Sequence, residues 1–259
     1  YVLSAKISLQ SVQKHTFKNA RKYIMGRAYE VRKASMAATS AKKSALYMRA
    51  SKEIYVAAKS GVPDPKENLA LRAAIEKFKG QSIPKDVIER AIEKAKGKDN
   101  TAFIPGRYEG MGPGGSLIVI DTLTDNVNRA FAEVRATLNH KGGKIANVAY
   151  NFQELGVLAF VGTDVDSVTE NLIMSDIDVK EVKKDEDDII EVTVAPSDLA
   201  KARDALTEMG VSEFLVNEIQ MVPNDYITLE GEEAQKFKNL IDALDELEDV
   251  QAVFHNVNL

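Results

Sequence analysis

The chain has no cysteine and no tryptophan among its 259 residues, and it has only three histidines. Without cysteine it can form neither disulfide bonds nor cysteine-ligated zinc sites. No apolar run approaches the ~18–20 residues that cross a bilayer, so we expect no membrane-spanning segment and no membrane partner. His15, His140 and His255 lie far apart in the sequence and lack metal-ligand spacing. We therefore expect them to have capping or surface roles, and we expect no metal and no cofactor.

Recognisable catalytic motifs are also missing. The glycine-rich stretch 110–115 could cradle a phosphate, but phosphate-binding loops open into a helix, whereas this one opens into an apolar run typical of a strand. A structural turn is the preferred interpretation. Because no nucleophile lies at a recognisable spacing from a base, we predict a non-enzymatic protein without a small-molecule substrate.

Charge is strongly segregated along the chain. The net charge is −5, yet residues 1–100 carry 22 Lys and Arg against 9 Asp and Glu, whereas residues 101–259 carry 12 against 30. A surface charged only for solubility would mix the two signs. Segregation instead indicates that the N-terminal part contacts a polyanion, while the acidic remainder is repelled by it.

Residues 26–98 have the composition and periodicity of helices. Breaks at Gly61–Pro65 and at Gly80 predict three helices joined by short loops. Asn68 is placed to cap the second helix. Residues 1–24 contain no acidic residue and resemble an organellar transit peptide. Met25 follows at once, which fits equally well an extension upstream of the true start, so this segment is left out of the predicted fold.

Strands and helices alternate beyond residue 100. Residues 147–223 predict β-β-α-β-β-α-β, with separate strands at 148–152 and 157–161. A last helix at about 230–246 and a strand at 250–257 could complete the sheet begun at Leu117. We thus predict an α+β fold, in which a three-helix N-terminal domain precedes two α/β sheet domains, the third inserted in the second. The predicted parts are an extension at 1–24, a basic helical domain at 26–98, an α/β domain at 103–146 plus 224–259, and an inserted ferredoxin-like α/β domain at 147–223.

Basic side chains interleaved with tyrosines are the positive functional signal. Cations neutralise phosphates, and aromatic rings can stack on unpaired bases. Tyr47 and Tyr55 could equally be core residues. A second exposed basic loop is expected around Gly142 and Gly143. The predicted nucleic-acid-binding residues are Arg27, Tyr29, Arg32, Lys33, Lys42, Lys43, Arg49, Lys52, Lys59, Lys141 and Lys144.

Long motifs resemble the YebC family, and most closely its YeeN-like branch. They cover the chain from about residue 25 to its end and include PDPKENLALRAAIEKFKGQSIPKDVIERAIEKAKG, GRYEGMGPGGSLIVIDTLTDNVNRAFAEVR, NHKGGKI and VFHNV. Many members have a tryptophan near the start, where this chain has Tyr29. Tyrosine keeps a ring for packing or stacking, so we expect the role to be retained.

The resemblance implies a helical domain plus two α/β domains, and a cytoplasmic protein that acts in gene expression. A mitochondrial location remains the alternative if residues 1–24 are a transit segment. The family includes probable DNA-binding transcriptional regulators, the mitochondrial translational activator of cytochrome c oxidase, and bacterial members associated with ribosomes stalled on proline-rich stretches. The N-terminal helices show no obvious recognition helix for reading base edges. We therefore favour ribosomal or transfer RNA on the ribosome as the partner, with DNA as the alternative.

Overall fold

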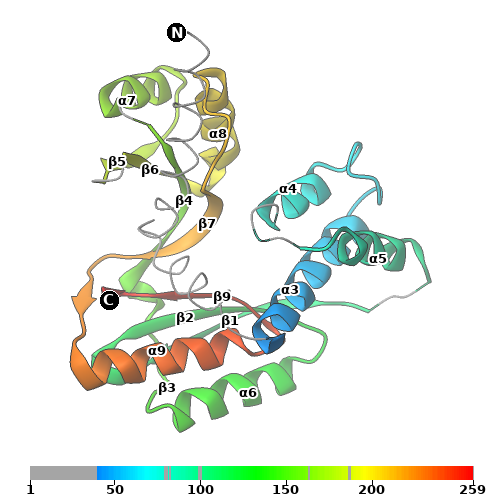
Figure 1. Cartoon of the computed structure of the whole chain (residues 1–259), viewed down its shortest axis with the longest axis vertical. Coiled ribbons are helices and arrows are strands. Elements are labelled where there is room, and N and C mark those ends of the chain that lie inside the picture. The colour runs from blue at the N-terminus through cyan, green and yellow to red at the C-terminus, as the bar shows by residue number, and fades with distance from the viewer. Residues whose placement is uncertain are drawn as a thin grey trace, which may run out of the picture. The chain divides into compact units, whose positions relative to one another are not determined.

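The computed structural model describes residues 40–78, 81, 83–98, 101–162, 164–185 and 188–258, with side chains from Lys43 onward. Helices come first and two four-stranded sheets follow, so the predicted α+β class is confirmed (Figure 1). The described chain divides into two units, residues 154–221 and the remainder, which are considered separately. The predicted extension 1–24 lies outside the described residues. No helix in the described part is long and apolar enough to cross a membrane.

The described part of the basic N-terminal domain contains three helices, α3 (Ser40–Lys59), α4 (Leu69–Phe78) and α5 (Lys85–Lys96). Their buried faces are built from small and apolar side chains spaced three or four residues apart, which places them on one side of each helix. Alanines such as Ala50, Ala58 and Ala91 are almost fully buried, because they let the helices approach closely. The predicted set of three helices matches these elements over the described range.

Asn68 determines where α4 begins. Its side-chain oxygen accepts the backbone N–H of Leu71 at 3.0 Å, which satisfies one of the unpaired donors of the first turn. Its amide nitrogen donates to the backbone oxygens of Ala57 at 2.9 Å and Val62 at 3.0 Å. The predicted cap is confirmed, and the same buried side chain also holds the α3–α4 loop against α3.

The second domain is a sheet with strand order β3-β1-β2-β9. Its elements are β1 (Ile104–Met111), η2 (Pro113–Gly115), β2 (Leu117–Thr124), α6 (Val127–His140), β3 (Lys144–Ile145), α9 (Gly231–Asp245) and β9 (Val250–His255). Both α6 and α9 lie on one side of this sheet (Figure 1), and their apolar faces form one core with it. Two short strands, β8 (Ile227–Thr228) and β10 (Val257–Asn258), pair in parallel with each other. Because β9 pairs with β2, residues from both ends of the domain complete a single sheet.

Strand β1 was not among the elements predicted from the sequence. Its two glycines and Pro105 hide the alternation expected of a strand. In the fold, a Cβ on Gly106 would lie 2.9 Å from Thr122 Oγ1, and a Cβ on Gly110 would lie 3.0 Å from both Leu138 and the backbone oxygen of Lys144. These glycines are therefore sites of close packing against neighbouring elements. The stretch 110–115 ends β1 at Met111 and then turns through η2 into β2, so it has the structural role that was the preferred interpretation.

The inserted domain contains β4 (Phe152–Val161), α7 (Val165–Met174), β5 (Val179–Lys184), β6 (Ile189–Val194), η4 (Pro196–Asp198), α8 (Leu199–Glu208) and β7 (Val216–Pro223). The strand order β5-β6-β4-β7 and the sequence βαββαβ describe a ferredoxin-like sheet. Apolar residues of α7 and α8 share one core with β4, β5 and β6. Asp164 caps α7 by accepting the backbone N–H of Ser167 at 2.9 Å.

The predicted separation of two strands at Leu155–Gly156 is wrong, because β4 is continuous through both residues. A Cβ on Gly156 would lie 3.0 Å from Leu199 Cβ and 3.0 Å from Val194 Cγ2. This glycine therefore allows α8 to pack closely on the strand and does not form a turn. The predicted strand at 148–152 is instead the short helix η3 (Ala149–Asn151), which leads into β4.

Candidate nucleic-acid interface

Two predicted binding residues on α3, Arg49 and Lys52, are buried. Arg49 Nη2 donates to the backbone oxygen of Asp245 and lies 3.3 Å from its Oδ1. Lys52 Nζ lies 2.6 Å from Asp249 Oδ1 and 3.1 Å from the backbone oxygen of Glu248. The two basic side chains are only 8% and 7% exposed. Their assignment to a phosphate-binding face is therefore wrong: they join the helical domain to the end of α9 and to the turn that follows it.

Asp249 is the centre of this domain junction. Besides Lys52, its carboxylate accepts hydrogen bonds from Arg129 at 2.9 Å and from the Thr124 hydroxyl at 2.8 Å. Arg129 also pairs with Asp125 at 2.7 Å. Burial by itself would raise the pKa of Asp249, but the hydrogen bonds from Lys52, Arg129 and Thr124 outweigh it and lower the pKa below its ordinary value. The carboxylate is therefore ionised in the folded protein.

The lowered pKa of Asp249 predicts a specific loss of stability in acid. A group with a depressed pKa in the folded state contributes stability above its unfolded pKa, about 3.9, and loses it as pH falls through the folded value. The urea midpoint of the wild type is expected to fall below about pH 4, and Asp249→Asn should show a shallower fall over that range. Equal pH dependence in both proteins would contradict this role for Asp249.

Other predicted basic residues remain at the surface. Lys43 is exposed near the start of α3, and Lys59 is exposed at its end, where Nζ donates to the backbone oxygen of Gly97 at 3.3 Å. Lys141 and Lys144 are exposed on either side of Gly142 and Gly143. The predicted residues Arg27, Tyr29, Arg32 and Lys33, and the side chain of Lys42, lie outside the described part of the structure.

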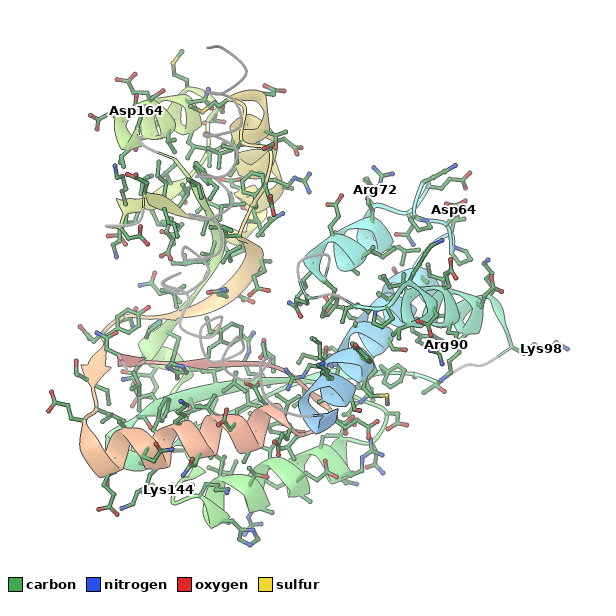
Figure 2. All side chains as sticks on the ribbon, in the orientation of Figure 1. Asp64, Arg72, Arg90, Lys98, Lys144 and Asp164 are labelled. Carbon is green, nitrogen blue, oxygen red and sulfur yellow. The ribbon has the colours of Figure 1, made fainter. Side chains whose placement is uncertain are left out.

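Three further exposed cations were not among the predicted site residues. Arg72 donates to the backbone oxygens of Pro65 at 3.1 Å and Lys66 at 2.8 Å, and is thereby oriented without neutralising its charge. Lys66 itself is exposed, as is Lys98 just beyond α5. Arg72 and Lys98 both extend from the helical domain (Figure 2). The sequence signal that could have found them is position: they lie in loops or near helix ends, where charged side chains are usually solvated.

Lys59, Lys66, Arg72 and Lys98 are named here the basic end of the helical domain. The hydrogen bond from Lys59 to Gly97 brings the ends of α3 and α5 together, and Arg72 holds the α3–α4 loop. The surface of α5 carries three ion pairs between residues three or four positions apart in the sequence: Lys85–Glu89, Arg90–Asp86 and Lys96–Glu93. Exposed pairs of this kind contribute little and exchange readily with other partners.

The tyrosine signal in α3 has a structural explanation. Tyr55 is 3% exposed and lies in the helical core. Its ring meets Phe103 edge-on at 5.7 Å, and Lys94 Nζ lies 5.4 Å from the ring centroid. Tyr55 is therefore a core residue, which was one of the two interpretations of the sequence. Tyr47 is half-buried.

The histidines described by the structure do not form a site. His140 is exposed in the last turn of α6, where a partial positive charge suits the helix dipole. His255 is buried, so the expected surface or capping role is wrong for this residue. Its Nδ1 accepts the backbone N–H of Val257 at 3.2 Å, and its ring packs edge-on against Phe237. In the described part of the chain, no group of three His, Asp or Glu residues is arranged to hold a metal ion. His15 lies outside this part.

A cleft of about 450 Å³ opens beside β1 and β2. Its charged lining consists of two ion pairs, Lys77–Glu53 at 3.0 Å and Arg107–Asp121 at 2.6 Å. Because each cation pairs with a carboxylate, the cleft does not present the net positive charge that an anion site needs. The exposed cations of the helical domain and of the loop after α6 are better candidates.

Comparison with known proteins assigns the chain to a family. Residues 27–98 match the TACO1/YebC protein N-terminal domain, and residues 104–257 match the TACO1/YebC second and third domain. The chain belongs to the TACO1/YebC family. The resemblance drawn from the sequence motifs is thereby confirmed.

Two relatives of this chain match it over most of its length. A probable transcriptional regulatory protein of Mesoplasma florum is 50% identical over 238 residues, which cover 91% of this chain and 100% of that protein. The crystal structure of a conserved hypothetical protein from Aquifex aeolicus superposes with a TM-score of 0.70 at 30% identity. That match covers 86% of this chain and 93% of the other.

Proposed function

We propose that this TACO1/YebC protein is a non-enzymatic, cytoplasmic regulator of gene expression that binds nucleic acid, with ribosomal or transfer RNA on the ribosome as the favoured partner. The observation that carries the proposal is the charge of the helical domain. With Arg49 and Lys52 left out, residues 40–98 still contain 12 Lys and Arg against 7 Asp and Glu. The acidic sheet domains would repel the phosphates, so that the basic surface is the part of the protein that faces them.

RNA is favoured by the placement of α3. Direct reading of a DNA major groove needs a helix whose polar side chains project together from an exposed face. The basic side chains in the middle of the 20-residue α3 point instead into the junction with the sheet domain. The exposed cations Lys43, Lys59, Lys66 and Lys98 lie near helix ends or in loops, a distribution that suits irregular phosphate positions. DNA remains the second candidate, because the Mesoplasma florum relative is named a probable transcriptional regulatory protein.

Sedimentation of cell extracts distinguishes these partners. We expect the wild-type protein to migrate with ribosomal subunits on a sucrose gradient, and we expect a variant with the basic end reversed to glutamate to stay at the top. A matched control reverses Lys180, Lys183, Lys201 and Lys236, which are also exposed but lie in the acidic domains. Wild-type protein that is entirely free or bound to the nucleoid would contradict the ribosomal proposal.

A further inference from the structure

Residues 141–150, here called the edge segment, contain the edge strand β3 and the loops on either side of it. Hydrogen bonds to neighbouring elements hold the main chain of this segment. Gly143 N–H donates to the backbone oxygen of Leu138 at 2.8 Å, and Ala146 N–H donates to that of Glu109 at 3.1 Å. The Glu109 carboxylate then accepts the N–H groups of both Val148 and Ala149 at 2.6 Å. These bonds to α6 and β1 hold the edge segment in place along its length.

Side chains on the edge segment are unusually exposed for their type. Tyr150 is 75% exposed, in contrast to the 3% of Tyr55, so its ring contributes little to the core. Ile145 is 39% exposed, and Lys141 and Lys144 are exposed at the opposite end of the segment. Lys144 extends from the sheet domain in Figure 2. Two cations and an exposed ring are therefore displayed along one rigid stretch of backbone.

A second aromatic residue is carried by the neighbouring segment that follows β7. Asn224 N–H donates to the backbone oxygen of Asn151 at 2.8 Å, and Gln153 donates to the Asn224 side chain at 2.8 Å. These bonds fix Asn224 beside the end of the edge segment. Tyr226, two residues further on, is 45% exposed. The adjacent Asp225 is also exposed, which makes this end less suitable for phosphates than the lysine end.

We propose that the edge segment, together with Tyr226, is a binding site for unpaired nucleotides. Lys141 and Lys144 contact phosphates, and the ring of Tyr150 stacks on a base. Stacking requires a base with an uncovered face, which a single strand offers and a continuous duplex does not. Because the main chain is already fixed, little ordering is required on binding. This inference rests on the proposed function and adds to it the class of ligand, a single-stranded stretch of nucleic acid.

The absence of tryptophan from the chain allows a direct test. Tyr150→Trp keeps a stacking ring and introduces a single fluorescent reporter at the site. The probe is a short single-stranded RNA without self-complementarity, compared with the same strand annealed to its complement. We expect the single strand to quench the tryptophan and the duplex to leave it unchanged. Met174→Trp, on the 88% exposed position of α7, is the matched control and should not respond.

Affinity measurements complete the test. Tyr150→Ala is expected to bind the single strand roughly 5- to 150-fold more weakly, since one stacked base is lost, whereas Tyr150→Phe should bind as the wild type does. If the wild type binds RNA but Tyr150→Ala binds equally well and Tyr150→Trp is silent, the stacking site is overturned while the proposed function stands. If the wild type binds neither RNA nor DNA, both are overturned. Quenching by a co-purified protein and not by RNA would identify a protein-docking surface and also overturn the inference.

Discussion

Asp249→Ala is expected to lower the free energy of unfolding by about 3–5 kcal/mol, because it leaves a buried ammonium group without its carboxylate. Lys52 Nζ would keep the backbone oxygen of Glu248, the more distant Glu248 carboxylate at 3.8 Å and the face of the Phe103 ring at 5.8 Å, none of which replaces a directly bonded carboxylate. Its side chain is 7% exposed, so bulk water compensates poorly for the lost partner. Thermal or urea unfolding followed by circular dichroism measures this loss.

Asp125→Ala is the matched control for this prediction. Asp125 pairs with the same Arg129 as Asp249 does, but its side chain is 45% exposed, whereas that of Asp249 is 3% exposed. We expect the Asp125 change to cost less than about 1 kcal/mol, as exposed pairs do. In a double-mutant cycle, Lys52→Met combined with Asp249→Ala should lose less than the two single changes added together. Equal, small losses for Asp125→Ala and Asp249→Ala would show that burial does not govern the junction.

Reversing the basic end to glutamate is expected to lower the affinity for RNA on the order of 10³-fold at about 0.15 M salt, and much less at about 1 M. Each phosphate contact releases a counterion, so four lost contacts should reduce the slope of log K against log salt by roughly four units. Fluorescence anisotropy with a labelled RNA over a range of salt concentrations measures both quantities.

The choice of residues decides whether this experiment can be interpreted. Arg49 and Lys52 are excluded because reversing either would place two carboxylates together in the buried junction and unfold the domain, which also abolishes binding. The side chains of the basic end are exposed, and the bonds of Lys59 and Arg72 to backbone oxygens lie at the surface, so we expect the far-ultraviolet circular dichroism spectrum to keep its helical signal. If a folded variant keeps the wild-type affinity and salt slope, the basic end does not contact RNA.

Local patterns predicted much of the architecture. Glycine and proline marked the helix breaks, Asn68 was recognised as a cap, and the family motifs in GRYEGMGPGGSLIVI and NHKGGKI identified the chain. The prediction was wrong where glycine had a packing role. At Gly156 and in β1, a residue that usually signals a turn instead makes room for a helix or a neighbouring strand. Such a role depends on what lies across the fold, and neighbours in sequence do not reveal it.

For this protein, the amino-acid sequence by itself determined the order of the helices and of most strands, the family, and the separation of a basic N-terminal part from an acidic remainder, because these depend on local spacing and composition. Only the tertiary structure decided which cations face solvent. Arg49 and Lys52 look like Lys43 and Lys59 in the sequence, yet carboxylates 196 and 197 residues away neutralise the first two inside the fold. Charge is a property of the residue, whereas its availability to a ligand depends on burial and on a partner that only folding brings near.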